Sequence, residues 1–452
     1  MKEILRELIG EFHKDTLPPF LPRSFEIPDL PKALRKAQIF VGMRRVGKIY
    51  LMFQHMERAL KRGLAKEKIL YLNFEDDRLT SFTSADFQLI LDVYFELYPS
   101  LTRADELIFY FDEIQNIVGW EKFIRRLLDK EKMSIFITGS SAKSLSKDLA
   151  TSLRGRSLER EVFPLGLKEY LLSLGIQDFK NLIAKERAAI VHHSKVYLKR
   201  GGFPETLQIS DAEHPRLLQS YVNAAVFRDV IDRHKLNNPH IVKLFLLHCL
   251  QTLSAPLSIT KVFNDFKSRG ESLTRARLYE YLSYFEDAYL IFQVPIYDLS
   301  FRKRQVNPSK IYCVDTGIIS AYSITPLMEE GVALENAVYI HLRKQEYEGI
   351  YFYKTKRGKE VDFVTLQANG KIELFQVSLR LDSEKTRERE LSALLEAAEE
   401  LKLNQAYLIT LDTKETIATK NLDIHVLPYW EWALNFSMLG CGRDVNRLKS
   451  LP

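Results

Sequence analysis

The chain has 452 residues, of which 46% are hydrophobic and 27% charged, and its formal net charge is +6 at pH 7. This length exceeds what one hydrophobic core supports, so we expect several domains, and the composition excludes intrinsic disorder and collagen-like repeats. No stretch reaches the roughly 20 apolar residues of a membrane span, and residues 1–15 lack the apolar core of a secretory signal. We therefore expect a cytoplasmic protein without membrane contact. The mildly basic charge permits a nucleic-acid partner.

Residues 35–163 alternate short β-branched or aromatic runs with stretches of helical periodicity. The runs read AQIFVG, KILYLNFE, ELIFYFDE and SIFITGS. Such alternation is typical of βα units around a parallel sheet, so we predict an α/β domain in this part of the chain.

A phosphate-binding loop is predicted directly after the first run. It consists of Gly42, Met43, Arg44, Arg45, Val46, Gly47 and Lys48. Backbone N–H groups of a loop with this spacing close around phosphates at a helix N-terminus, and the lysine adds a positive charge beside them. The alternative is a plain glycine turn between strand and helix.

The two residues that follow the loop are included in the predicted nucleotide site, but they do not fit its usual metal chemistry. A hydroxyl normally follows the lysine and binds Mg²⁺, whereas this chain has Ile49 there. Tyr50 lies about 100° further round the helix and does not replace it easily. Magnesium binding at this position is therefore in question.

Two further runs end in polar side chains that suit phosphoryl transfer. The run LIFYF ends in Asp112 and Glu113, where the first carboxylate is predicted to hold Mg²⁺ and the second to orient the attacking water. A solvated strand end is the alternative. The run SIFI is followed by Thr138 and Ser140, which we expect to sense the γ-phosphate; a simple polar turn is the alternative.

Two arginines precede the strand-like run REVF. Arg154 and Arg156 stand where an arginine can reach a phosphate bound by a neighbouring subunit, which predicts a homo-oligomer. A surface ion pair explains them equally well.

A series of motifs in order resembles the prokaryotic AAA-type P-loop ATPases that carry a C-terminal domain of unknown function. The likeness covers nearly the whole chain, and it rests on GMRRVGK (42–48), YLNFEDDRL (71–79), YFDEIQ (110–115), ITGSSAKSLS (137–146), LRGR (153–156), GGFPE (201–205) and VDF (361–363). The resemblance implies ATP, rather than GTP, as the nucleotide, with Mg²⁺. The chain departs from the family pattern at Ile49.

The resemblance and the element pattern together predict an α/β protein in four parts. These are an AAA-like P-loop domain with a parallel sheet (1–165), a helical linker or lid (166–235), a winged-helix-like domain (236–325) and a C-terminal α/β domain with a restriction-endonuclease-like fold (326–452). For the last part we expect the order helix, three strands, helix, strand.

The winged-helix-like part carries basic residues that make DNA a candidate partner. Two helices are predicted at 258–269 and 272–287, with Arg275 and Arg277 at the start of the second, where a recognition helix meets DNA. Arg302-Lys303-Arg304 is expected in the loop between two strands. Ordinary core packing with solvated basic residues is the alternative.

The C-terminal domain has kept only part of a nuclease motif. Asp362 remains as a candidate metal ligand, but the acid and the lysine expected on the next strand are Gln376 and Ser378. Glu335, on the preceding helix, can approach Asp362. We therefore expect cleavage to be lost, while Lys354, Lys356, Arg357 and Lys359 attract a phosphate backbone.

Three functions remain open from the sequence. The first is an ATP-binding switch or motor with weak ATPase activity that acts on nucleic acid. The second is a metal-dependent nuclease regulated by nucleotide, and the third is a non-hydrolysing nucleotide-binding scaffold for a protein partner.

Overall fold

The computed structural model describes residues 1–31, 34–103, 106–130, 133–139, 155–323, 326–419 and 421–435. The chain divides into two compact units. Unit 1 contains Met1–Phe163 and Asp287–Tyr289, and unit 2 contains Pro164–Glu286 and the chain from Leu290 onward. Across the described ranges, every helix is too short or too polar to cross a membrane.

Unit 1 is built on a parallel sheet of five strands, as the alternation of runs predicts. The strands are β1 (Ala37–Val41), β2 (Ile69–Asn73), β3 (Leu107–Asp112), β4 (Met133–Gly139) and β5 (Ser157–Glu161), in the order β2-β3-β4-β1-β5. All neighbouring strands run parallel. This arrangement confirms the predicted α/β class.

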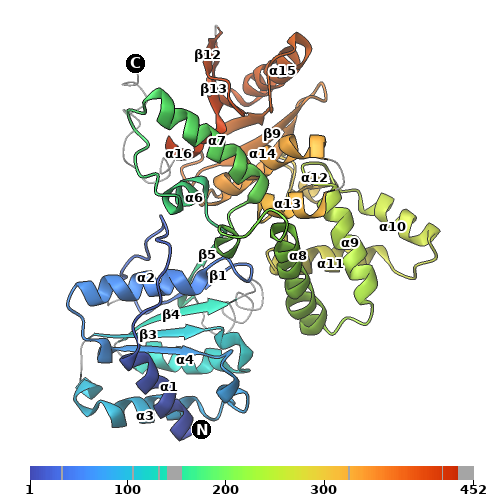
Figure 1. The fold of residues 1–452 in the computed structure, drawn as a ribbon. Helices are drawn as coiled ribbons and strands as arrows, with labels where there is room; N and C mark the ends of the chain where they lie inside the picture. Colours follow the sequence, from blue (N-terminus) through green and yellow to red (C-terminus); the bar gives the residue numbers. More distant parts are fainter. Residues whose placement is uncertain are drawn as a thin grey trace. The chain divides into compact units, whose positions relative to one another are not determined.

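Helices cover both faces of this sheet. They are α1 (Lys2–Lys14), α2 (Lys48–Lys61), α3 (Phe87–Leu97) and α4 (Trp120–Lys130). Figure 1 shows α2 on one side of the strands and α3 and α4 on the other. Because both faces are covered, β1 and β3 are buried along their whole length, which explains their uninterrupted apolar sequences.

The first half of unit 2 is mainly helical. Its helices are α6 (Leu167–Ser173), α7 (Ala184–Arg200), α8 (His214–Ala225), α9 (Pro239–Gln251), α10 (Ile259–Ser268), α11 (Arg275–Asp287), α12 (Phe301–Val306) and α13 (Thr316–Tyr322). Two short strands, β6 (Ile291–Val294) and β7 (Lys310–Cys313), pair antiparallel. Helices α10 and α11 occupy the positions predicted for the two helices of the winged-helix-like part.

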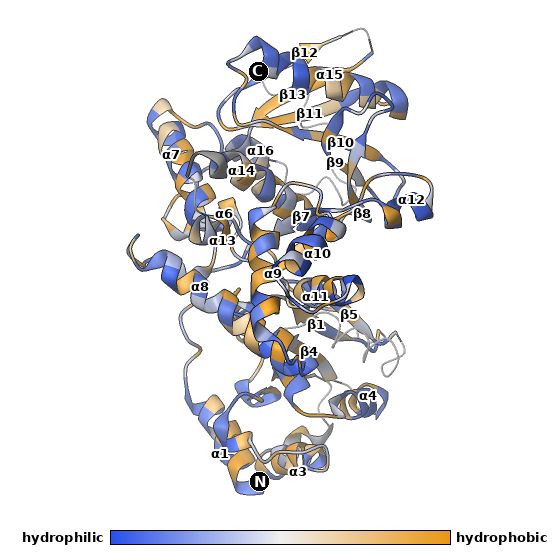
Figure 2. Cartoon of the chain, turned by 90° about the vertical axis from the view of Figure 1, so that its right-hand side faces the viewer, coloured by the Kyte–Doolittle hydropathy of each residue, from blue (hydrophilic) through white to orange (hydrophobic). Residues whose placement is uncertain are grey.

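One local prediction is wrong in this region. The run Arg302-Lys303-Arg304 was expected in a loop, but it lies in helix α12 between β6 and β7. Ser300 explains the difference, because its side chain caps the helix by accepting a hydrogen bond from the backbone N–H of Lys303. Hydrophilic and hydrophobic stretches lie side by side on α12 in Figure 2.

The second half of unit 2 contains a mixed sheet of six strands. Its elements are α14 (Pro326–Arg343), β8 (Gly349–Lys354), β9 (Glu360–Leu366), β10 (Ile372–Val377), α15 (Glu384–Leu401), β11 (Gln405–Thr410), β12 (Glu415–Ala418), β13 (Asp423–Pro428) and α16 (Tyr429–Asn435). The strand order is β12-β13-β11-β10-β9-β8. The predicted order of helix, three strands, helix and strand is found from α14 to β11.

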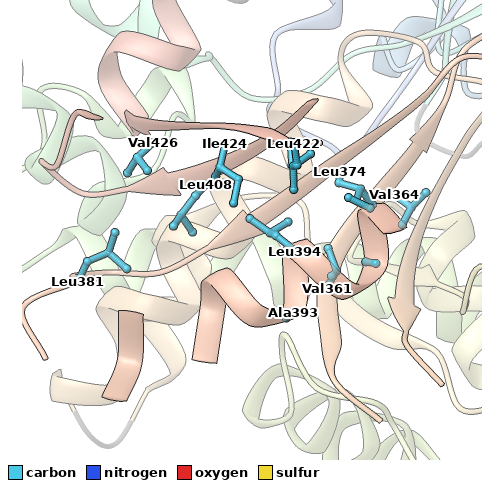
Figure 3. Close-up of a cluster of buried hydrophobic side chains, with 13 residues drawn as sticks. Val361, Val364, Leu374, Leu381, Ala393, Leu394, Leu408, Leu422, Ile424 and Val426 are labelled. Carbon is cyan, nitrogen blue, oxygen red and sulfur yellow. The ribbon is translucent and has the colours of Figure 1, made fainter. Parts of the chain in front are cut away.

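An apolar cluster joins α15 to this sheet. Figure 3 shows Leu394 of α15 beside Val361, Leu374 and Leu408, which come from three different strands. Leu394 and these strand residues are completely buried. The cluster therefore sets the position of β9 and β10, on which Asp362 and Gln376 lie.

Candidate functional site

The predicted phosphate-binding loop joins β1 to α2 at the edge of the sheet where the parallel strands end. Gly42 is required there, because a Cβ atom at this position would lie 2.2 Å from the backbone oxygen of Val162. Gly47 has a φ of 92°, which a glycine adopts without strain. Arg45 also has a positive φ, of 70°. The loop is thus a tightly curved backbone that opens directly into a helix N-terminus, which is the geometry that binds phosphates.

Lys48 is the first residue of α2 and lies in the concave side of its own loop. Its side chain is 7% exposed, and Nζ donates hydrogen bonds to the carbonyl oxygens of Gly42, at 3.0 Å, and Met43, at 3.1 Å. Nζ also lies 3.8 Å from Oε1 of Glu113. The ammonium group is therefore held between the loop and the acid pair, within reach of both.

The acid pair lies at the end of β3, two strands away from β1 in the sheet. Asp112 and Glu113 are both buried, and the Thr138 hydroxyl, at the end of the intervening β4, donates a hydrogen bond to Asp112. The same hydroxyl accepts a hydrogen bond of 3.2 Å from the backbone N–H of Glu113. Thr138 is thus completely buried and holds the two acids in place.

The electrostatics of Asp112 follow from this burial. Desolvation, and next the charge of Glu113, raises the pKa of Asp112 to about 6, although Thr138 and Lys48 act in the opposite direction. A bound cation would relieve both effects, because it would compensate the two carboxylates at once. The donor set at the end of β3 therefore suits a divalent cation.

Two residues around the loop, Arg23 and Glu75, were missed by sequence reasoning. Arg23 donates hydrogen bonds to the carbonyl oxygens of Val46, at 2.9 Å, and Phe163. Arg44 of the loop forms an ion pair of 2.8 Å with Glu75, which follows β2. Glu75 lies inside the motif YLNFEDDRL, so that motif already contained the signal, whereas Arg23 stands in a segment without periodicity.

The remaining predicted residues of this site divide into three groups. Ile49 is half-buried and Tyr50 exposed on the first turn of α2, where neither offers Mg²⁺ a hydroxyl next to Lys48. Arg156 forms an ion pair with Asp129 of α4, which agrees with the surface ion pair that the sequence left open as the alternative. Arg154 and Ser140 lie outside the described residues.

A second polar cluster forms around Asp362 in unit 2. The Nζ atom of Lys310, on β7, lies 2.9 Å from Oδ1 of Asp362, 2.9 Å from Glu360 and 3.2 Å from Glu335. Lys310 was missed by sequence reasoning, although a lysine at the start of the apolar run KIYC was an available signal. Glu335 approaches Asp362, as expected, but the ammonium group of Lys310 forms an ion pair with each of them.

The partner positions of Asp362 are engaged elsewhere. Gln376 accepts a hydrogen bond from the backbone N–H of Asp362 and donates one of 2.7 Å to Glu390. The Ser378 hydroxyl donates to the carbonyl oxygen of Arg380. With Lys310 in place, no group of three or more His, Cys, Asp or Glu side chains within the described ranges is arranged to hold a metal ion.

The protonation of the cluster follows from its surroundings. Burial alone lowers the pKa of a lysine, but the carboxylates of Asp362, Glu335 and Glu360 outweigh it and raise the pKa of Lys310. Burial, and then the charge of Asp362, raises the pKa of Glu335. The raised pKa favours the charged ammonium form of Lys310.

The basic residues predicted to contact DNA have local partners. Arg277 pairs with Glu280 at 2.8 Å, and the Arg275 guanidinium lies over the ring of Phe263. In the C-terminal domain, Lys354 and Lys359 lie 3.6 Å and 3.3 Å from glutamate oxygens. These exposed pairs reduce the positive potential that each group of residues presents.

The parallel sheet and its loop place unit 1 among AAA-type P-loop proteins. Residues 34–171 match the family described as an AAA domain, and residues 191–327 and 330–432 match two domains of unknown function, DUF8612 and DUF4143. The chain is 34% identical over 430 residues to the uncharacterized protein MJ1544 of Methanocaldococcus jannaschii, covering 92% of this chain and 91% of that one. The chain belongs to the same family as this archaeal protein.

Other similar proteins are more distant. An uncharacterized protein of Haemophilus influenzae is 29% identical over 333 residues, which cover 74% of this chain and 80% of that one. The solved structure of the Aeropyrum pernix ORC2 protein in its ADP form is 13% identical, with a TM-score of 0.33, over 71% of this chain and 97% of that one. The A. pernix ORC1 protein in complex with DNA is 15% identical, with a TM-score of 0.25, over 72% and 92%. TM-scores this low do not establish a common arrangement of the chains.

Proposed function

We propose that the chain binds ATP at the loop from Gly42 to Lys48 and hydrolyses it slowly, as a switch or motor that acts on nucleic acid. The observation that carries the proposal is the position of Lys48. Its ammonium group lies between a strongly curved loop at a helix N-terminus and the buried pair Asp112 and Glu113. Positive charge and backbone donors on one side, and carboxylates on the other, match the needs of phosphoryl transfer.

The residues take the following roles in this proposal. Lys48 exchanges its bonds to the carbonyl oxygens of Gly42 and Met43 for bonds to the phosphates. Asp112, oriented by Thr138, is the residue that would hold Mg²⁺, which supplies charge neutralisation when bound. Glu113 orients the attacking water. Because Ile49 provides no hydroxyl on the other side of the metal, we expect weak metal binding and slow turnover.

The loop is tested with a fluorescent ATP analogue. Lys48→Ala should weaken binding by at least about tenfold, because it removes a buried positive charge that lies beside the carbonyl oxygens of the loop. Lys61→Ala is the matched control, since Lys61 lies at the far end of the same helix and pairs on the surface with Glu57. Equal affinity of Lys48→Ala and the parent for the analogue would mean that the loop is a turn without a role in nucleotide binding.

The nucleic-acid part of the proposal concerns the basic residues of unit 2. We take residues 236–325 as a winged-helix-like domain, with α10 and α11 as its two helices, and residues 326–452 as a restriction-endonuclease-like domain. The candidate DNA contacts of the winged-helix-like domain are Arg275 and the basic residues of α12. A homo-oligomer in which Arg154 reaches the nucleotide of a neighbouring subunit is part of the same proposal. Turnover measured with and without duplex DNA at low salt separates this function from a scaffold, because only the switch or motor should respond.

A nuclease function is less well supported. It requires a cation that Asp362 shares with other carboxylates and a water molecule, but the ammonium group of Lys310 contacts those carboxylates. We therefore derive no cleavage step in this domain.

A further inference from the structure

Three carboxylates of unit 2 converge on one point, although they come from separate elements. Glu335 belongs to α14, while Glu360 and Asp362 belong to β9. Their oxygens lie 3.2, 2.9 and 2.9 Å from a single atom, Nζ of Lys310. The Lys310 side chain is 1% exposed, so water does not replace any of these contacts.

The surrounding groups hold the carboxylates in position. The second oxygen of Asp362 accepts a hydrogen bond of 2.9 Å from the backbone N–H of Val377. Glu335 also accepts one of 2.7 Å from the hydroxyl of Tyr312, which lies on the same strand as Lys310. Oxygens of three carboxylates thus surround the ammonium group of Lys310. Asp362 and Glu335 are 10% and 15% exposed, whereas Glu360 is 33% exposed and also lies 3.6 Å from Lys354.

We infer that Lys310 is the built-in cation of this domain and occupies the place that a divalent metal takes among converging carboxylates. Such carboxylates are too costly to bury without a cation, so each site of this kind needs one. A lysine supplies the charge, but it cannot polarise or activate a water molecule as a metal does. The site is therefore structural, and it excludes divalent metals for as long as the lysine is present.

Removal of the ammonium group should convert the site into one that binds a divalent metal. In Lys310→Met, without nucleotide and with EDTA, the melting temperature should fall by on the order of 10 °C, because the carboxylates lose their counter-charge. Addition of 1 mM Mn²⁺ should raise it by about 5 °C more than in the parent. The double variant Lys310→Met/Asp362→Asn should lose this extra response.

Two controls complete the experiment. Lys371→Met removes an exposed lysine whose ammonium group pairs at 2.9 Å with a single buried carboxylate, Glu373, of the same domain, so it should show no Mn²⁺ response. In the background that keeps Lys310, Asp362→Asn should leave the parent's response to Mn²⁺ unchanged. This second comparison needs no folded Lys310→Met protein.

Two results would overturn the inference. A folded Lys310→Met protein without an extra Mn²⁺ response would show that the carboxylates do not form a cation site. A parent response to Mn²⁺ that disappears in Asp362→Asn would show that a metal binds beside Lys310.

Discussion

Single residues decide the chemistry of the two polar sites. In unit 1, Ile49 stands where the proposed mechanism requires a hydroxyl for Mg²⁺, next to Lys48, which lies 3.8 Å from the buried Glu113. In unit 2, Lys310 stands among carboxylates that would otherwise bind a cation. The two residues act differently, since Ile49 takes away a neutral ligand for a metal, whereas Lys310 adds the positive charge that balances the carboxylates.

Ile49→Thr should increase ATP turnover by about tenfold, because it returns a hydroxyl ligand for Mg²⁺ next to Lys48. Tyr50→Thr is the matched control, since the same side chain would point about 100° away. Phosphate release under saturating MgATP measures both variants. A rate no higher than the parent's would mean that water already fills the place of the ligand, or that hydrolysis is not the task of this protein.

At the scale of elements, the motif GGFPE is explained by packing. Asp315 caps α13 through the backbone N–H of Gly317, and its other oxygen accepts a hydrogen bond of 2.7 Å from the backbone N–H of Gly202. A Cβ atom on Gly202 would lie 2.1 Å from the backbone oxygen of Leu165, and one on Gly317 would lie 2.2 Å from that of Arg200. The glycines therefore allow three segments of unit 2 to meet around one buried carboxyl group.

This junction should make the stability of unit 2 depend on pH. Burial raises the pKa of Asp315 to about 6 from its usual 3.8, although the two backbone donors act against it. A carboxyl group with a raised pKa stabilises the fold fully below its unfolded pKa and loses that contribution as pH rises through the folded pKa. The free energy of unfolding should therefore fall between pH 4 and pH 6, by about 1–3 kcal/mol from this group.

Urea unfolding of the parent and of Asp315→Asn at several pH values measures this effect. The asparagine variant should be less stable throughout, because it offers its amide to a backbone donor, but its stability should change less over this pH range. Parallel pH profiles for the two proteins would show that Asp315 is not the titrating group.

At the scale of the whole molecule, the described residues of the candidate nucleotide site lie in unit 1. The loop packs on Val162, Arg23 fixes Val46 and Phe163, and the acid pair lies on β3. All these contacts lie within residues 1–163. These contacts of the candidate site, all between described residues, therefore lie within unit 1.

A fragment of residues 1–171 should consequently fold by itself and bind the ATP analogue within about threefold of the affinity of the full chain. A fragment of residues 1–155 should fail, because it lacks β5, which pairs with β1 along its whole length. Thermal melts followed by circular dichroism, together with the binding assay, compare the two fragments. Loss of binding in the longer fragment, despite a cooperative melt, would contradict a site confined to unit 1.

The sequence by itself determined the α/β class of unit 1, the loop, the acid pair and the order of elements from α14 to β11. These features are local, because they depend on the periodicity of apolar residues and on the spacing of glycines and carboxylates over a few positions. The helical form of α12 was missed, since a single capping residue decided it.

Only the tertiary structure decided which distant residues share a charge. Lys310 and Asp362 are 52 positions apart, and Gly202 and Asp315 are 113 apart, so no local pattern connects them. The partner of Thr138 was also decided by the tertiary structure. Its hydroxyl was expected to contact a phosphate, but in this structure it donates a hydrogen bond to Asp112. A buried charge or hydroxyl must find a partner wherever the fold supplies one, and that partner is set by packing rather than by sequence spacing.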